Sequence, residues 1–373
     1  MATHVGTSGD AELFGLGEFD AGTGLSGRPL GETVSGSDFV YDPFDAYRAG
    51  LVSNPNVIVT GAIGSGKSSV VKMMIARALE RGRRVVVVDP KGEYHSVAEL
   101  LGGTSWRLGI DGWCAPFSDE TGEDREAALA AWSVATGRAF SARERLVALA
   151  LVSRSGPSKH PLRRWRDLGA KDLSEDLLAG LDRLIEGDLA GLFEGPGDPL
   201  CVDGSFTVVD VSAHWGRESL PLAALAAVAT ARRGVGEDRG THVVIDEAWA
   251  LLADPTTLTW MRGSWKLARA RATSHLLVLH RTSDVEAVAP AGSAQRATAD
   301  GLLRDCDTAV VMRQAESDVI DLVGTHSGRR RVLAQLGRGE ALWRSGSSWS
   351  LVRLRPDETD WALIDTDQRM RFA

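Results

Sequence analysis

The residues best suited to chemistry form one glycine-rich stretch, Gly61-Ala62-Ile63-Gly64-Ser65-Gly66-Lys67-Ser68, followed by Ser69. It matches the phosphate-binding pattern G-x-x-x-x-G-K-[ST] at every defined position. The three glycines allow backbone conformations in which successive N–H groups turn towards phosphate oxygens. Lys67 supplies a positive charge for the β- and γ-phosphates, and the Ser68 hydroxyl can bind Mg²⁺. The pattern predicts a nucleotide site with contacts from Gly61, Gly64, Ser65, Gly66, Lys67, Ser68 and Ser69.

Two adjacent carboxylates, Asp246 and Glu247, follow the apolar run Val243-Val244-Ile245. Such a run is typical of a buried strand, and polar groups at strand ends lie where open α/β sheets place their ligands. Asp246 would hold Mg²⁺, mostly through water molecules, and Glu247 would polarise the attacking water as a general base. The alternative is that both residues only cap the following helix, where the helix dipole favours negative charge. The upstream phosphate-binding pattern favours the catalytic interpretation.

His280 ends another apolar run, His275-Leu276-Leu277-Val278-Leu279. A polar residue at such a strand end could contact the γ-phosphate as a sensor, and the polar residues 281–284 beside it favour that role. The alternative is a histidine that only satisfies its own hydrogen bonds. The predicted catalytic residues are therefore Glu247, Lys67 and His280, and the predicted metal ligands are Ser68 and Asp246.

The predicted cofactors are ATP and Mg²⁺. The chain has only two asparagines, Asn54 and Asn56, so it has no N-K-x-D motif with which to read guanine. No segment like L-S-G-G-Q precedes Asp246, which disfavours a transporter-type ATPase cassette. An adenine nucleotide is the remaining expectation.

The elements that must position these residues alternate between strands and helices. Residues 57–60 and 84–89 have the apolar composition of buried strands, and residues 68–81 between them have helical periodicity. The N-terminus of that helix would face the phosphates. Further strand–helix alternation follows residue 206, and residues 340–352 could form a closing hairpin. We expect an α/β fold of the RecA-like P-loop NTPase class with a mostly parallel central sheet.

A region of helical periodicity without strands interrupts this alternation. It contains Ser141 followed by Glu144, the signature of a capping box, and Arg163, Arg164 and Arg166 in an expected loop. We interpret it as an all-helical insertion. The expected organisation is a disordered Gly/Ser-rich arm (1–38), a first ATPase part (39–112), the helical insertion (113–200), a second ATPase part (201–355) and a polar tail (356–373).

Composition narrows the class of protein. The chain has 373 residues, of which 43% are hydrophobic and 25% charged, as in ordinary globular proteins. Its net charge of −8 argues against general coating of DNA, while leaving room for a local basic patch. No stretch is long and apolar enough to be a transmembrane segment, and the N-terminus has no signal-peptide layout, so the expected location is cytoplasmic.

Together the motifs resemble those of the conjugative type IV secretion ATPases, within the HerA–FtsK branch of P-loop pumping ATPases. The resemblance is carried by NPNVIVTGAIGSGKSS at 54–69, DPKGEY at 89–94 and VVIDEAWALL at 243–252, and extends over roughly residues 40–353. The chain departs from the family pattern at His280, where the family usually has glutamine. It also has an acidic, glycine-rich arm in place of the large N-terminal region of the secretion-assembly ATPases.

The resemblance implies a motor that assembles into a homo-oligomeric ring, as a hexamer, and uses ATP to transfer DNA or protein. It also implies membrane-embedded secretion components as partners, which would hold the ring peripherally at the membrane. An arginine from the neighbouring subunit would complete each site, with Arg269, Arg304 and Arg313 as candidates. Two alternatives stay open: a DNA translocase or helicase-like ATPase without a secretion role, and a nucleotide-binding scaffold that hydrolyses slowly or not at all.

Overall fold

The computed structural model describes residues 22–117, 122–155, 158, 160–196, 198–202, 204–232, 239–280, 292–315 and 327–365. Within these ranges the α-helices are α2 (Pro43–Arg48), α3 (Lys67–Glu80), α4 (His95–Leu100), α5 (Gly122–Thr136), α6 (Ala142–Arg154), α7 (Pro161–Gly169), α8 (Glu175–Ile185), α9 (Leu220–Ala231), α10 (Trp249–Leu252), α11 (Pro255–Lys266), α13 (Ala294–Arg304), α15 (Ser327–Gln335) and α16 (Glu358–Ile364). Two short 3-10 helices are η1 (Ser212–His214) and η2 (Arg269–Arg271).

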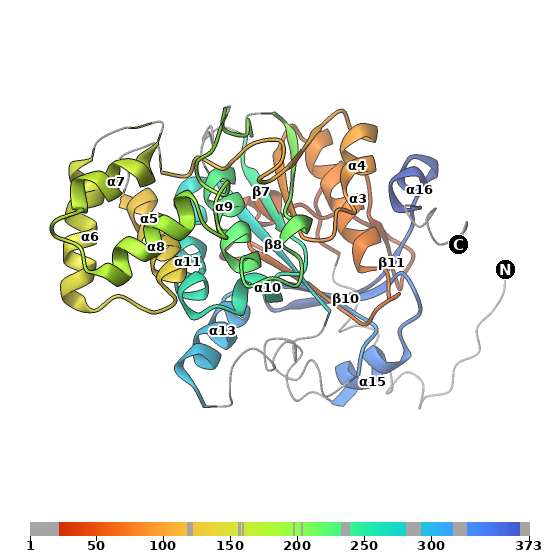
Figure 1. Cartoon of the computed structure of the whole chain (residues 1–373). Helices are drawn as coiled ribbons and strands as arrows, with labels where there is room; N and C mark the ends of the chain where they lie inside the picture. The colour runs from red at the N-terminus through yellow and green to blue at the C-terminus, as the bar shows by residue number, and fades with distance from the viewer. Residues whose placement is uncertain are drawn as a thin grey trace.

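A single sheet lies at the centre of the molecule (Figure 1). Its strands are β1 (Gly31–Thr33), β2 (Asp38–Phe39), β3 (Val57–Thr60), β4 (Arg84–Asp89), β5 (Thr104–Arg107), β6 (Phe206–Asp210), β7 (Thr241–Ile245), β8 (Thr273–Leu279), β9 (Thr308–Met312), β10 (Glu340–Ser345) and β11 (Ser348–Leu354). In the described residues these 11 strands have the order β2-β1-β11-β10-β9-β3-β8-β7-β4-β6-β5.

Two modes of strand pairing divide the sheet. From β9 through β3 to β5, neighbouring strands are parallel. From β9 through β10 and β11 to β2, they are antiparallel. The predicted hairpin is therefore confirmed, and it extends an otherwise parallel sheet. Parallel strands share one direction, so the carboxyl ends of β3, β8, β7 and β4 lie along the same edge.

The four valines of β4 explain why this strand lacks alternation. Val85 and Val87 pack into an apolar cluster with α3 and α4, whereas Val86 and Val88 pack into a cluster with α9, α10 and α11 on the other face. All six residues of β4 are buried. Burial of each such side chain contributes roughly 1.5–3 kcal/mol, so a strand covered on both faces has apolar side chains at successive positions, here four valines.

Helices α5 to α8 form the predicted helical insertion, at the left of Figure 1. Its core contains Trp132 and Trp165, stacked with ring centroids 6.4 Å apart, and the indole N–H of Trp132 donates to the Leu177 carbonyl at 2.8 Å. The capping box of Ser141 and Glu144 begins α6 as predicted. The arginines expected on a loop instead lie on α7, because Pro161 sits at the first helical turn, where proline favours helix initiation.

The ends of the described chain differ from the expected arm and tail. Residues 31–33 form β1, which pairs with β11, so the predicted arm of residues 1–38 contains sheet strands where it is described. Residues 1–21 lie outside the described residues. In the predicted polar tail, α16 packs against α3. None of the described helices combines the length and apolarity needed to cross a membrane.

Candidate nucleotide-binding and catalytic site

The glycine-rich stretch forms a loop between the end of β3 and the start of α3, as predicted. Gly64 and Gly66 have φ angles of 76° and 111°, which side-chain-bearing residues rarely adopt. Gly61 is needed for a different reason: a Cβ there would lie 2.8 Å from the Cβ of Met312 on β9. The loop is thus held close to the neighbouring strand and leads into the N-terminus of α3, a position that favours anions.

The loop's polar side chains differ in exposure. The Lys67 ammonium is buried and donates to the carbonyls of Gly61 and Ala62, at 2.6 and 3.1 Å. Ser65 is also buried, and its hydroxyl has no hydrogen-bond partner among the described residues. Ser68 is exposed and Ser69 half-buried at the first turn of α3. The loop therefore offers a buried hydroxyl, an exposed hydroxyl and a lysine folded onto its own backbone.

Asp246 lies at the end of β7, where the sequence predicted a metal ligand. Its side chain is buried, and one carboxylate oxygen accepts the N–H of Glu247 at 3.0 Å. Burial, followed by the negative charges of Glu247 and Asp89, raises the pKa of Asp246 to about 6. A cation beside such a carboxylate would stabilise its ionised form. The hard oxygens of Asp246 and Ser68 fit the ligand preference of Mg²⁺, which takes few protein ligands alongside phosphate and water.

Glu247 lies next along the chain and is surrounded by donors. Its Oε1 contacts the Lys91 ammonium and the His280 Nε2, the latter at 2.5 Å, and its Oε2 accepts the indole N–H of Trp249 at 2.7 Å. Burial opposes ionisation, but His280 and Lys91 outweigh it and lower the pKa of Glu247 to about 2. The helix α10 begins at Trp249 without a side-chain cap, so neither carboxylate caps it.

The predicted carboxylates, His280 and the nucleotide loop follow the carboxyl ends of three adjacent parallel strands. His280 follows β8, which lies between β3 and β7 in the sheet. Its Nε2 contacts Glu247, and its other ring nitrogen is buried without a partner among the described residues. The polar run 281–284, which favoured the sensor role, lies outside the described residues. His280 is thus placed between the nucleotide loop and the carboxylates.

Two further residues at this edge had no predicted role. Lys91 belongs to the DPKGEY segment, where Asp89 accepts backbone N–H groups of Lys91, Gly92 and Tyr94 at 2.9–3.1 Å and so fixes the turn. Gln314 follows β9 and is buried, and its side-chain oxygen accepts the Thr60 hydroxyl at 3.3 Å. The available signal was their position, since each lies two residues after a buried strand.

The candidate arginines lie at opposite ends of the parallel strands. Arg269 precedes β8 and donates to the Ser53 carbonyl at 3.4 Å, and Arg304 ends α13 just before β9. Both are therefore at the amino ends of parallel strands, away from the nucleotide loop. Arg313 follows β9 at the carboxyl edge, and its carbonyl accepts the N–H of Ala62 at 2.8 Å. Only Arg313 among the three thus lies beside its own chain's loop.

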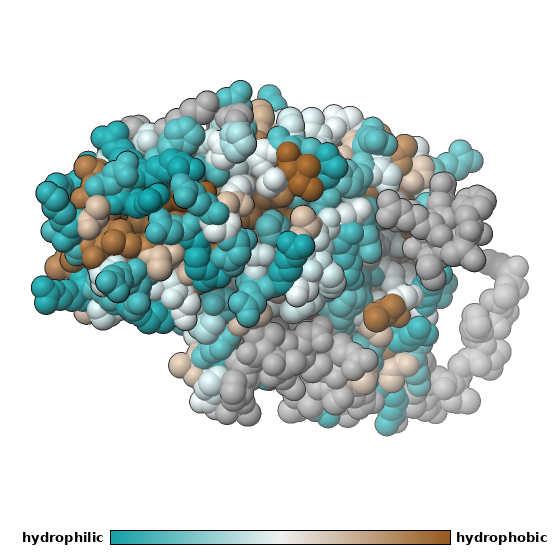
Figure 2. Space-filling model, viewed as in Figure 1, coloured by the Kyte–Doolittle hydropathy of each residue, from teal (hydrophilic) through white to brown (hydrophobic). Residues whose placement is uncertain are grey.

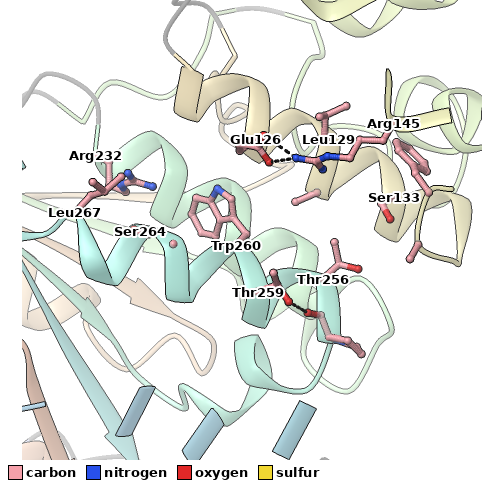
Figure 3. A pocket seen from close by; sticks show the side chains of 15 residues that line it. Glu126, Leu129, Ser133, Arg145, Arg232, Thr256, Thr259, Trp260, Ser264 and Leu267 are labelled. Atoms are coloured by element: carbon pink, nitrogen blue, oxygen red, sulfur yellow. Dashed lines mark hydrogen bonds and ion pairs between the residues drawn. The ribbon is translucent and has the colours of Figure 1, made fainter. Parts of the chain in front are cut away.

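A cavity of about 460 Å³ lies elsewhere, between the helical insertion and α11 (Figure 3). Trp260 from α11, Leu267 just after α11, and Leu129 from α5 give it a mostly apolar wall. An exposed ion pair between Arg145 and Glu126 spans its rim. Apolar residues are also visible on the surface of the insertion, at the left of Figure 2. None of the predicted site residues lines this cavity, so it is separate from the nucleotide site.

Comparisons with known proteins agree with the motifs. The TraG P-loop domain family matches residues 27–109. The fold is similar to that of VirB4 of Thermoanaerobacter pseudethanolicus, with a TM-score of 0.76 and 21% identity over 90% of this chain and 98% of that one. It is also similar to the bacterial conjugative coupling protein TrwBΔN70, with a TM-score of 0.57 and 16% identity over 92% and 97% of the two chains.

Further TrwB structures contain nucleotides. One, in complex with ADP and Mg²⁺, has a TM-score of 0.55 and 16% identity over 89% of this chain and 90% of that one. No curated protein sequence matches this chain. The comparisons confirm the RecA-like P-loop NTPase fold and the resemblance to the conjugative type IV secretion ATPases.

Proposed function

We propose that this chain, a P-loop NTPase by motif and fold, binds and hydrolyses ATP as the motor of a conjugation or type IV secretion apparatus. The observation that carries the proposal is the convergence of three elements at one sheet edge. The phosphate-binding loop follows β3, His280 follows β8, and Asp246 and Glu247 follow β7, on adjacent strands. TrwB, which shares the fold, binds ADPNP in one structure and ADP with Mg²⁺ in another.

Each residue has a role in this proposal. Lys67 would leave the loop carbonyls to contact the β- and γ-phosphates, and the loop N–H groups would bind phosphate oxygens. Ser68 and Asp246 would hold Mg²⁺, which neutralises phosphate charge when bound. A water oxygen attacks the γ-phosphorus as Glu247 accepts the water's proton, and the bond to the β-phosphate oxygen breaks, releasing ADP and phosphate. His280 would orient Glu247 and contact the γ-phosphate.

Assembly belongs to the proposal because the phosphate-binding motif supplies one cation, Lys67, and a further positive charge on the open side of the γ-phosphate would come from outside that motif. We infer a homo-oligomeric ring, a hexamer, in which an arginine of the next subunit supplies that charge. The ring would act in the cytoplasm, docked peripherally on membrane-embedded secretion components, and would move DNA or protein.

A slow or non-hydrolysing scaffold is the second candidate. The observation favouring it is that Glu247, the proposed base, already has both carboxylate oxygens engaged by Lys91, His280 and Trp249. A base in that arrangement accepts a proton poorly. The scaffold would bind nucleotide with the same loop and use it to stabilise a complex.

A DNA-stimulated ATPase assay separates these functions. Phosphate release would be measured over a range of protein concentrations, with and without double-stranded and single-stranded DNA, and with Lys67→Ala as the control for contaminating activity. A steady rate without DNA supports the secretion motor. Strong stimulation by DNA supports a translocase instead. Nucleotide binding without turnover under any of these conditions contradicts the motor and supports the scaffold.

A further inference from the structure

Both carboxylate oxygens of Glu247 are occupied by neighbouring donors. Its Oε1 is shared by the Lys91 ammonium and the His280 ring, and its Oε2 bonds the Trp249 indole. The Glu247 side chain is only 4% exposed, whereas Lys91 and His280 above it are 30% and 29% exposed. A general base must present an oxygen to the attacking water at hydrogen-bond distance. Here the outer side of the carboxylate is covered by Lys91 and His280, so water reaches it poorly.

The backbone at Glu247 also indicates a restrained conformation. Its φ angle is 48°, one of two positive values among the described residues other than glycine. Such conformations are sparsely populated and persist where surrounding contacts impose them. The contacts here come from three separate segments, after β4, after β8 and at the start of α10.

We propose that Lys91 is a positioning residue that restrains Glu247 until a nucleoside triphosphate binds, and that the third phosphate then draws the Lys91 ammonium away and frees the carboxylate. The inference rests on the proposed ATPase function and assigns to the DPKGEY segment the regulation of that site.

The side chain of Lys91 can move while its backbone stays fixed. Asp89 accepts three backbone N–H groups of the turn, and Gly92 has a φ angle of 70°, so the turn itself is tightly defined. The lysine stem is flexible and its end is partly exposed. The exposed Trp215 ring lies 5.7 Å from the ammonium and offers it a second contact.

A triphosphate in the loop is the anion placed to compete for this ammonium. Neighbouring strands lie about 4.8 Å apart, so the end of β7 is about 10 Å from the end of β3, with β8 between them. In the proposed site the third phosphate would extend from the loop towards β7, whereas a diphosphate would end earlier. It carries more negative charge than one carboxylate, and the interior strengthens the attraction. Binding of ATP should therefore separate Lys91 from Glu247, and binding of ADP should not.

The test is a double-variant cycle on nucleotide affinity. The Kd values of ADPNP with Mg²⁺ and of ADP with Mg²⁺ would be measured by calorimetry for the wild type, Lys91→Met, Glu247→Gln and the double variant. If ADPNP breaks the Lys91–Glu247 pair, only the wild type loses that pair on binding. The product of the wild-type and double-variant Kd values should then exceed the product of the single-variant values at least about fivefold for ADPNP. For ADP the two products should be equal.

Controls separate this restraint from a general electrostatic effect. The charge changes of each single substitution cancel in the cycle, and the same cycle with exposed Lys266→Met in place of Lys91→Met should give equal products for both nucleotides. Lys91→Arg, which keeps the charge, should behave as the wild type does. If Lys91→Met fails to fold, Lys91→Gln takes its place in the cycle.

Two results would be decisive against the proposal. Equal products for ADPNP would mean that the pair stays closed when the triphosphate is bound, and equal deviations for ADP and ADPNP would mean that the third phosphate is not the trigger. Failure of the proposed function has a different signature, because the wild type would then bind neither nucleotide, or would bind ADPNP and never hydrolyse ATP.

Discussion

Arg77 on the P-loop helix α3 and Asp360 on α16 form a buried, two-pronged ion pair. The guanidinium donates to the two carboxylate oxygens at 2.6 and 2.7 Å, and the side chains are 2% and 0% exposed. Arg77 also donates to the carbonyl of Pro29, just before β1. This one side chain thus joins the start of the described chain, the nucleotide-binding helix and the C-terminal helix.

Asp360→Asn should therefore destabilise the whole domain. The substitution keeps the size of the side chain but leaves the Arg77 charge buried without its counter-ion, which typically costs about 3–5 kcal/mol. Chemical denaturation followed by tryptophan fluorescence measures this loss. Glu358→Gln, at an exposed position on the same helix, is the matched control and should change stability little. A variant as stable as the control would show that α16 contributes little to the fold.

The features that the sequence predicted depend on local patterns, and those that it missed depend on contacts between distant segments. The nucleotide loop, Asp246, Glu247 and His280 could be predicted because each depends on a local pattern, a buried strand followed by polar residues. The contact between Lys91 and Glu247 could not, because it depends on β4 lying next to β7, and the last residues of these strands, Asp89 and Ile245, are 156 positions apart in the sequence. Strands β1 and β2 are too short to have a periodicity, and they are strands because β1 pairs with β11 and β2 pairs with β1.

Lys67→Ala should abolish nucleotide binding and leave the fold intact. The ammonium is the motif's only side-chain charge available to the phosphates, and in the structure it donates to the loop carbonyls of Gly61 and Ala62. Calorimetric titration with ATP and Mg²⁺ measures the loss, and a thermal unfolding curve checks the fold. ATP affinity equal to that of the wild type would refute the assignment of the loop.

Glu247→Gln should retain nucleotide binding and stop turnover. The amide keeps the size of the side chain but cannot accept the water's proton, and losses of a general base reduce rates by about 10²–10⁴-fold. Phosphate release under saturating ATP measures the rate, and titration with ADPNP measures binding. If the variant hydrolyses ATP within a few-fold of the wild type, the proton acceptor is another residue.

His275 should make stability fall as the pH drops. Burial, with a smaller effect of the Arg232 charge, lowers the pKa of His275 to about 3. Its ring is fully buried, stacks on Trp265 and lies 3.2 Å from the Asn56 amide oxygen. Between roughly pH 6.5 and 3 the unfolded chain binds a proton that the folded chain does not, so stability falls by up to about 1.4 kcal/mol per pH unit in that window.

The variant His275→Gln isolates this contribution. It removes the titrating group while keeping a polar side chain opposite Asn56, so its stability should depend less on pH between 6.5 and 4.5, whatever its stability at pH 7. Denaturation curves at several pH values give the slope of the free energy of unfolding against pH for the variant and for the wild type. Identical slopes for the variant and the wild type would mean that His275 does not titrate differently in the folded chain.

Turnover should depend on assembly through an arginine acting between subunits. Arg269 and Arg304 lie at the amino ends of β8 and β9, and a strand of five to seven residues spans about 17–23 Å, so neither reaches its own chain's phosphates. Either could reach a neighbour's site, where such an arginine contributes on the order of 10³–10⁵ in rate. Specific activity should rise with protein concentration and reach a plateau as rings form. A flat specific activity with a monomeric mass throughout would contradict the ring.

Mixing variants distinguishes the three candidate arginines. Arg313 lies beside its own loop, so it would act within its own chain. In a ring that mixes Arg313→Ala and Lys67→Ala subunits, no chain has both Lys67 and Arg313, and the ring should stay inactive. Arg269→Ala or Arg304→Ala, whichever removes the acting residue, should bind ATP but be inactive alone. Mixed with Lys67→Ala, it should regain the activity of alternating subunits, because the dead-site subunit lends its arginine to the intact site. Recovery with Arg313→Ala instead would show that the ring brings the carboxyl edge of one sheet to the loop of the next.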